Sequence, residues 1–182
     1  MFIDIDTLCK INQFTRREFK ASELYTFQVV LCDNEIDQDG ERFSIPALKK
    51  LAELFIGKTG IFNHGGRVED QIARIFDCHV EFFKTCMTSA DEPYARLVAQ
   101  AYLPKTDSNA DFITELESGI KKEASVGCAV SKVTCSICGA NLKNGGCEHI
   151  RGQKYGGTVC CAVLDEPTDA YEWSFSLKVK PK

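Results

Sequence analysis

The sequence lacks a long apolar run, an excess of basic residues and a cationic N-terminus. No stretch approaches the roughly 20 apolar residues that a helix needs to cross a bilayer, so we expect no membrane association. There are 22 Lys and Arg residues against 26 Asp and Glu, a formal net charge of -4. A nucleic-acid-binding surface normally shows a basic excess, so we expect no nucleic-acid partner. The N-terminus, MFIDIDTLCK, has acids where a secretory signal has positive residues, which predicts a cytoplasmic protein.

Internal repeats and low-complexity segments are also missing, and a chain of 182 residues predicts a single domain spanning 1–182. Two amphipathic helices are predicted, one over 44–56, capped by Ser44, and one over 109–118, ended by Gly119. Without a regular strand–helix alternation, the pattern predicts an α+β fold with a mainly antiparallel β-barrel core and surrounding helices. The strand candidates are 25–32, 72–83, 94–103, 123–130, 159–164 and 171–179.

Cysteine is abundant, with ten residues, and five of them lie between 135 and 161. Cys135 and Cys138 form a CxxC turn, and a CxH turn follows at Cys147 and His149. Tetrahedral zinc takes four nitrogen or sulfur ligands, and each of these short turns can present two of them. We therefore predict a zinc-knuckle insert over 133–161 that holds a structural zinc ion through Cys135, Cys138, Cys147 and either His149 or Cys160. A redox CxxC is the alternative, and no thioredoxin-like βαβ pattern surrounds it.

Histidine is scarce, and its three positions differ in context. His149 belongs to the cysteine cluster and His79 lies within a predicted strand, whereas His64 ends a short strand beside two glycines. A second candidate is Ser125, because its neighbours on the same strand face, Gly127 and Ala129, leave the backbone open to a ligand. A serine nucleophile needs such access and a base to take its proton. Taken alone, His64 and Ser125 are each also typical of structural positions.

Two lysines offer a different base for the same serine. Lys121 and Lys122 precede Ser125, and serine–lysine dyads are a known form of this chemistry. A lysine must be desolvated to lose its proton, whereas a charged Lys-Lys-Glu run is typical of a surface that faces water.

In order and spacing, these segments resemble the prohead (capsid-maturation) serine protease family of tailed bacteriophages. The resemblance covers residues 20–179 and rests on four short motifs. They are the D-x-D-G loop at 37–40, the strand IFNH that ends at His64, the serine motif from Gly119 to Gly127 with SVG at Ser125, and the late E-x-S at 172–174. The sequence departs from the family at Gly65, where many members have Asp, and in its last residues, which suggest a shortened or processed form.

The resemblance implies a serine endopeptidase with Ser125 as nucleophile, His64 as general base and Glu172 as the acid that orients the imidazole. It implies a fold similar to that of herpesvirus assemblins. The implied substrates are phage scaffold and major capsid proteins, together with the protease itself. The expected location is the immature procapsid inside the bacterial host cytoplasm. Both a monomer and a homo-oligomer are compatible with the sequence. The family does not require the zinc insert.

A non-enzymatic function is the competing hypothesis. The chain could be a capsid-assembly or scaffold module that keeps the protease-like fold and uses the zinc knuckle to bind a partner. A nucleic-acid-binding zinc module is a third hypothesis, which the acidic balance and the few aromatic residues near the cysteines disfavour.

Overall fold

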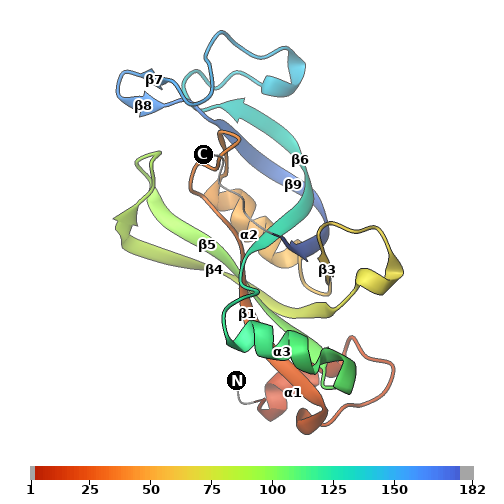
Figure 1. Cartoon of the computed structure of the whole chain (residues 1–182). Helices are drawn as coiled ribbons and strands as arrows, with labels where there is room; N and C mark the ends of the chain where they lie inside the picture. Colours follow the sequence, from red (N-terminus) through yellow and green to blue (C-terminus); the bar gives the residue numbers. More distant parts are fainter. Residues whose placement is uncertain (1–2, 177–182) are drawn as a thin grey trace.

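The computed structural model describes residues 3–176 of the chain (Figure 1). Within this range strands predominate over helices. The α-helices are α1 (Ile5–Asn12), α2 (Ile45–Leu54) and α3 (Ala110–Glu117). The strands are β1 (Leu24–Asp33), β2 (Glu41–Phe43), β3 (Thr59–Phe62), β4 (Ala73–Met87), β5 (Pro93–Pro104), β6 (Ala124–Cys135), β7 (Lys154–Tyr155), β8 (Thr158–Val159) and β9 (Ala162–Phe175). The predicted α+β class is confirmed.

The main sheet is open, so the predicted barrel is wrong. Its strand order is β1-β5-β4-β3-β9-β2, and β6 pairs with β9 as well. It is also mixed, because β2 and β3 run parallel to β9. Closure would require β1 to pair with β6, but no ladder joins these two strands within residues 3–176. The rings of Phe27 on β1 and Phe175 on β9 lie 6.2 Å apart, in the core.

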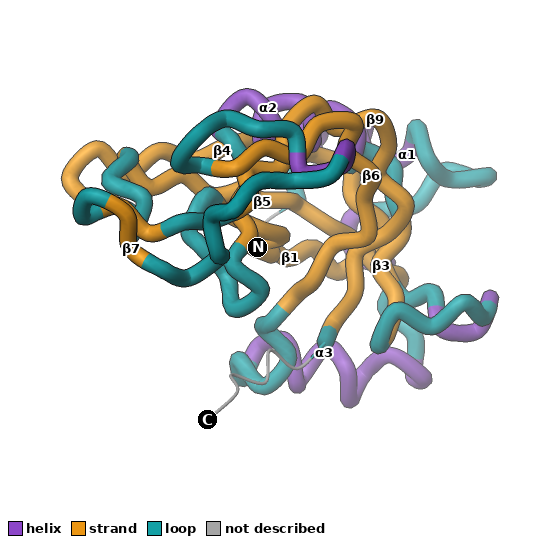
Figure 2. The backbone as a smooth tube through the Cα atoms, turned by 90° about the horizontal axis from the view of Figure 1, so that it is seen from above, coloured by secondary structure: helices purple, strands orange, loops and turns teal. Residues whose placement is uncertain are grey.

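Helix α2 matches its prediction and covers part of the sheet. Ser44 caps the helix, because its hydroxyl accepts a hydrogen bond from the Ala47 N–H at 3.0 Å. Leu48 and Leu51 are fully buried against β4, β5 and β9. Figure 2 shows α2 and α3 on opposite sides of the strands.

Helix α3 also matches its prediction, with Phe112 buried and with Ile113 and Leu116 partly buried against the main core. Phe112 is buried and packs edge-to-face against Phe62 and Phe175, with ring centroids 5.2 Å apart in both pairs. Edge-to-face pairs of this kind contribute about 0.5–1.5 kcal/mol beyond the area they bury. The helix therefore packs beside β3 and the end of β9.

Helix α1 was not predicted, because only eight residues carry its pattern. Asp4 caps it by accepting a hydrogen bond from the Thr7 N–H at 2.8 Å. Its one fully buried side chain, Ile11, packs in a small second core with Leu24, Phe76 and Tyr102. None of the helices within residues 3–176 is long and apolar enough to span a membrane.

The last two predicted strands are parts of one long strand, β9, although the end of the prediction, 177–179, lies outside the described residues. The acidic segment around Pro167 hid this continuity in the sequence. Two register shifts leave Tyr171 and Thr168 of β9 as extra residues opposite β6, which accommodates that segment without ending the ladder. Strand β9 thus pairs with β6 on one side and with β2 and β3 on the other.

Candidate functional site

Strands β6 and β9 bring the predicted serine and glutamate to the same face of the sheet. Ser125 lies opposite Ser174, and Gly127 lies opposite Glu172, in the antiparallel register. Directly paired residues project to the same face, and so do residues two apart on one strand. All four therefore share one face.

The opposite face of these strands is the core. Trp173 is fully buried and Phe175 nearly so, and both pack with Ala124 and Val126 of β6. The alternation predicted for the segment EASVGCAV is therefore confirmed at its beginning, with alanine and valine inward and serine and glycine outward.

His64 reaches this outer face from β3, which lies on the other side of β9. Asn63 and His64 have φ angles of 50° and 52°, a left-handed conformation that costs non-glycine residues energy. Two hydrogen bonds to β9 hold the turn. The His64 N–H donates to the Ser174 hydroxyl at 2.9 Å, and the Asn63 N–H donates to the Phe175 carbonyl at 3.1 Å. In the E-x-S motif, the sequence predicts a function only for the glutamate. It does not predict that the Ser174 hydroxyl accepts a hydrogen bond from the His64 N–H.

The His64 ring is bonded to Glu172. His64 Nδ1 and Glu172 Oε1 are 2.7 Å apart, with the histidine side chain 43% exposed and the glutamate side chain 19% exposed. A carboxylate can only accept, so Nδ1 carries the proton. With a neutral ring, Nε2 is then unprotonated and available as a base.

Gly127 leaves room for this pair. A Cβ atom at Gly127 would lie 2.5 Å from Glu172 Oε1, closer than such atoms can approach. The sequence had assigned Gly127 to ligand access, whereas the structure shows that the glutamate carboxylate lies over it. Ser125 is half-buried beside it, and its hydroxyl makes no hydrogen bond with another residue of 3–176.

The two lysines considered as alternative bases pair with surface acids. Lys121 lies 4.0 Å from Glu115, and Lys122 lies 3.9 Å from Glu123. Both ammonium groups are well solvated, so neither is in the desolvated setting that a lysine base requires.

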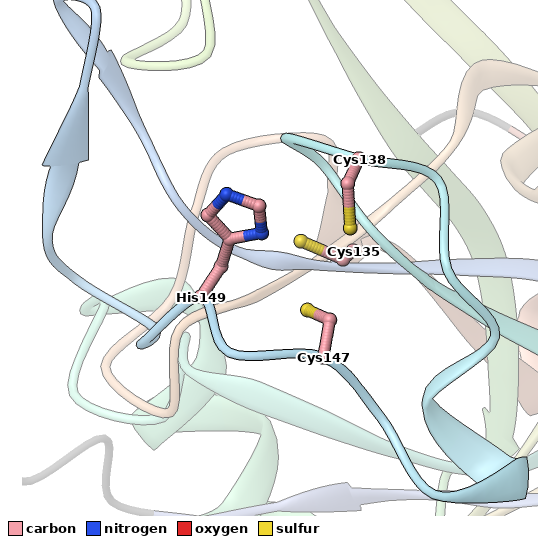
Figure 3. A group of neighbouring side chains, drawn as sticks. All are labelled: Cys135, Cys138, Cys147 and His149. Carbon is pink, nitrogen blue, oxygen red and sulfur yellow. The ribbon is translucent and has the colours of Figure 1, made fainter.

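A second cluster lies at the far end of β6. The ligand atoms of Cys135, Cys138, Cys147 and His149 are all within 4.8 Å of one another, and this group could hold a metal ion. Figure 3 shows the three sulfur atoms and the imidazole ring facing a common space. His149 Nδ1 is buried without a hydrogen-bond partner in residues 3–176, as expected of a nitrogen that a metal would bind.

The structure distinguishes between the two candidates for the fourth metal ligand, His149 and Cys160. His149 belongs to the group, and Cys160 does not. The Cys160 sulfur instead contacts the Cys135 sulfur at 3.9 Å. Cys160 is therefore a fifth sulfur beside the four potential ligands.

The environment of Cys135 favours a thiolate. Burial raises the pKa of its thiol, but hydrogen bonds from the backbone of Cys138 and Ile137, together with neighbouring thiols, lower this pKa to about 6. The Ile137 N–H lies 3.4 Å from the sulfur. Burial and the adjacent Cys135 raise the pKa of Cys160 to about 11. Because metals bind thiolates, Cys135 is the better prepared ligand of the two.

The loop around this cluster is tied to the rest of the protein. Its first predicted residues, 133–135, are the end of β6, and the loop contains the β7–β8 hairpin. Arg151 forms an ion pair with Glu41 at 2.6 Å, which connects the loop to β2. His149 packs edge-on against Tyr155, with ring centroids 4.6 Å apart. These contacts hold one potential ligand in place from outside the cluster.

Comparison with protein-family models, with curated proteins and with solved structures finds no match for this chain.

Proposed function

We propose that this chain is a serine endopeptidase of the prohead-protease type, with Ser125 as nucleophile, His64 as general base and Glu172 as the residue that orients the base. The observation that carries the proposal is the 2.7 Å hydrogen bond from His64 Nδ1 to Glu172, made on the sheet face that Ser125 shares. The nucleophile comes from β6, the base from the turn that follows β3, and the orienting acid from β9.

The reaction is acyl transfer through a covalent intermediate. His64 Nε2 takes the Ser125 proton as the hydroxyl attacks a peptide carbonyl, and it then gives that proton to the leaving amine. Water attacks the acyl-enzyme in the second half of the reaction, with His64 again as base. Glu172 stabilises the imidazolium that forms in each half.

The substrate class rests on the sequence motifs. By resemblance, the substrates are the scaffold and major capsid proteins of a tailed phage, and the protease itself, inside an immature procapsid in the bacterial cytoplasm. The partly exposed His64 is compatible with a protein substrate that approaches this open face of the sheet.

A fluorophosphonate probe tests the nucleophile directly, because it forms a bond only to an activated serine. We expect intact-mass measurement to show one adduct per chain, mapped to Ser125, and none on the Ser125→Ala or His64→Ala variants. Ser131→Ala is the matched control, since Ser131 lies on the same strand with its hydroxyl bonded to Glu166. No adduct on the wild type, or an adduct at another serine, would overturn the proposal.

Co-expression with the scaffold and capsid proteins of the same phage tests the substrate class. The wild type should shorten at least one of them, and Ser125→Ala should shorten none. Equal processing by both proteins would show that Ser125 is not the nucleophile.

A non-enzymatic assembly module is the second candidate function. It is favoured by one observation, that no hydrogen bond joins Ser125 to His64 within residues 3–176. In unliganded proteases this bond is often long, so the observation is also compatible with an enzyme. A chain that assembles with capsid proteins but neither labels nor cleaves would establish the module.

For the second cluster, we propose that the metal is zinc and that its function is structural. Three sulfurs and one imidazole form a typical tetrahedral zinc donor set, and four protein ligands leave no open position for a substrate. Elemental analysis of protein purified without chelators should give one zinc per chain. A Cys147→Ala variant should lose it, whereas a Cys86→Ala variant, which removes an exposed cysteine outside the cluster, should keep it. Metal-free wild-type protein would overturn the assignment.

A further inference from the structure

Cys160 is a fifth thiol that the four-ligand site does not use. It is 2% exposed, and its sulfur lies 3.9 Å from that of Cys135, which is 3% exposed. No disulfide joins Cys135 to Cys160 in the structure. Cys135 is therefore shared between two arrangements, a metal site with three other residues and a thiol pair with Cys160.

The backbone holds the two sulfurs close together. Cys135 ends β6 and pairs with Ala162, two residues after Cys160. The Cys160 N–H donates to the Gln153 carbonyl at 2.8 Å, and its carbonyl accepts from the Gly152 N–H at 2.8 Å. The ladder thus fixes one cysteine and the β7–β8 hairpin connection fixes the other, so rotation of the side chains is the main movement left for a bond to form.

We propose that Cys135 and Cys160 form a disulfide when a peroxide oxidises this site, and that the disulfide releases the metal ion. A metal needs the thiolate of Cys135, and a disulfide sulfur carries no such charge. Metal binding and oxidation therefore compete for one sulfur atom. Once the Cys135 sulfur is in a disulfide, only three potential ligands remain for the metal, and one of them, Cys138, is exposed to solvent.

The oxidation proceeds in two balanced steps. The Cys135 thiolate attacks hydrogen peroxide, a sulfur–oxygen bond forms, the oxygen–oxygen bond breaks, and hydroxide leaves to be protonated to water. The Cys160 thiol then attacks that sulfur, the sulfur–sulfur bond forms, and the second oxygen leaves as water with the Cys160 proton. Two thiols are oxidised, one peroxide is reduced, and the metal leaves as its divalent cation.

The inference rests on the metal part of the proposed function and is independent of the protease part. Its experiment uses the full-length metal-loaded protein, treated with hydrogen peroxide in the presence of a chromogenic chelator. We expect metal release to parallel the loss of two hydrogen atoms per chain in intact mass, and peptide mapping to join Cys135 to Cys160. A link from Cys135 to Cys138, or release without any link, would overturn the proposal.

Two neighbouring buried cysteines provide the variant and its control. Cys160→Ala should keep the metal, form no link to Cys135, and release metal about tenfold more slowly, because the resolving thiol is missing. Cys161→Ala should behave as the wild type, since Cys161 is equally buried and lies next to Cys160 in the chain. Each variant loses one buried sulfur, so both should unfold at a slightly lower temperature than the wild type, by similar amounts, before oxidation.

Two further outcomes separate the possible failures. If purified Cys160→Ala lacks metal while His149→Ala keeps it, Cys160 is a ligand and the thiol-pair proposal is wrong. If the wild type binds no metal, the zinc assignment fails. In that case, mapping of the peroxide-treated protein still decides whether Cys135 and Cys160 pair.

Discussion

Two small residues beside Glu172, Ser174 and Gly127, determine how His64 is held next to the carboxylate. Ser174 is fully buried, and its hydroxyl accepts the hydrogen bond of the His64 N–H in a left-handed turn. Gly127 provides the space that the Glu172 carboxylate occupies. At this scale the His64–Glu172 pair depends on these two neighbouring residues, and each of them can be changed singly.

Ser174→Ala should weaken both the turn and the site. Losing the acceptor of the partly buried His64 N–H costs about 0.5–1.5 kcal/mol in the free energy of unfolding. With its backbone loosened, His64 should also activate Ser125 less well, so fluorophosphonate labelling should slow. Urea unfolding and labelling rates measure the two effects, with Ser131→Ala as control. Wild-type values in both assays would show that Ser174 does not position His64.

Gly127→Ala should act through Glu172. The added methyl group would lie 2.5 Å from Oε1, so the carboxylate must move away from His64, and labelling of Ser125 should fall to about the level of Glu172→Ala. Because both changes remove one interaction, the double variant should label no more slowly than Glu172→Ala alone. Additive losses in the double variant would indicate that Gly127 acts in another way, such as substrate access.

At the scale of elements, β9 organises the molecule. One of its faces carries Glu172 and Ser174, and the other buries Trp173 and Phe175 in the core. The strand on its parallel side approaches closely, because Gly60 of β3 lies against the indole of Trp173. The position of His64 therefore depends on packing that begins four residues earlier in the chain.

Gly60→Ala should destabilise the fold at this contact. A Cβ atom there would lie 2.3 Å from the Trp173 ring, which is fully buried and cannot move aside freely. Overpacking of this kind costs about 1–3 kcal/mol in the free energy of unfolding, measurable by urea denaturation. Gly66→Ala is the matched control, because no atom lies within 4 Å of its added Cβ, and a change of about 0.5 kcal/mol at most is expected. Equal stability of the two variants would contradict the packing argument.

At the scale of the whole molecule, the two clusters occupy opposite ends of one strand. Ser125 is near the start of β6 and Cys135 is its last residue, so roughly 33 Å of extended chain separates them at 3.3 Å per residue. The main core, built from α2 and the large sheet, contains none of the four potential metal ligands, although Cys135 is itself buried. The metal loop is therefore a local unit attached to a sheet that has its own core.

Metal removal should disorder the loop and leave the sheet folded. Treatment with a chelator should increase amide hydrogen exchange over residues 136–161, while exchange in β1, β4 and β5 stays slow. Fluorophosphonate labelling of Ser125 should change by less than about twofold, because the sheet around Ser125 is held by a core that does not include the metal ligands. Cooperative unfolding of the whole chain after chelation would show that the metal is part of the main folding unit.

Much of this could be predicted from the sequence, because the signals involved are local. Four features depend only on residues that are close together in the chain. They are the cap of α2, the alternation at the start of β6, the CxxC and CxH turns, and the strand that ends near His64. Short motifs of this kind determine helix ends, strand faces and ligand turns whatever the rest of the fold does.

Only the tertiary structure decided which of these local pieces meet. The register of β6 and β3 against β9 brought Glu172 to His64. The tertiary structure also left the sheet open. It placed His149 among the potential metal ligands and left Cys160 beside Cys135. Pairing between segments as distant as 64 and 172 depends on strand register and on how the core fills, because those contacts are made across the sheet and leave no periodic trace in the chain.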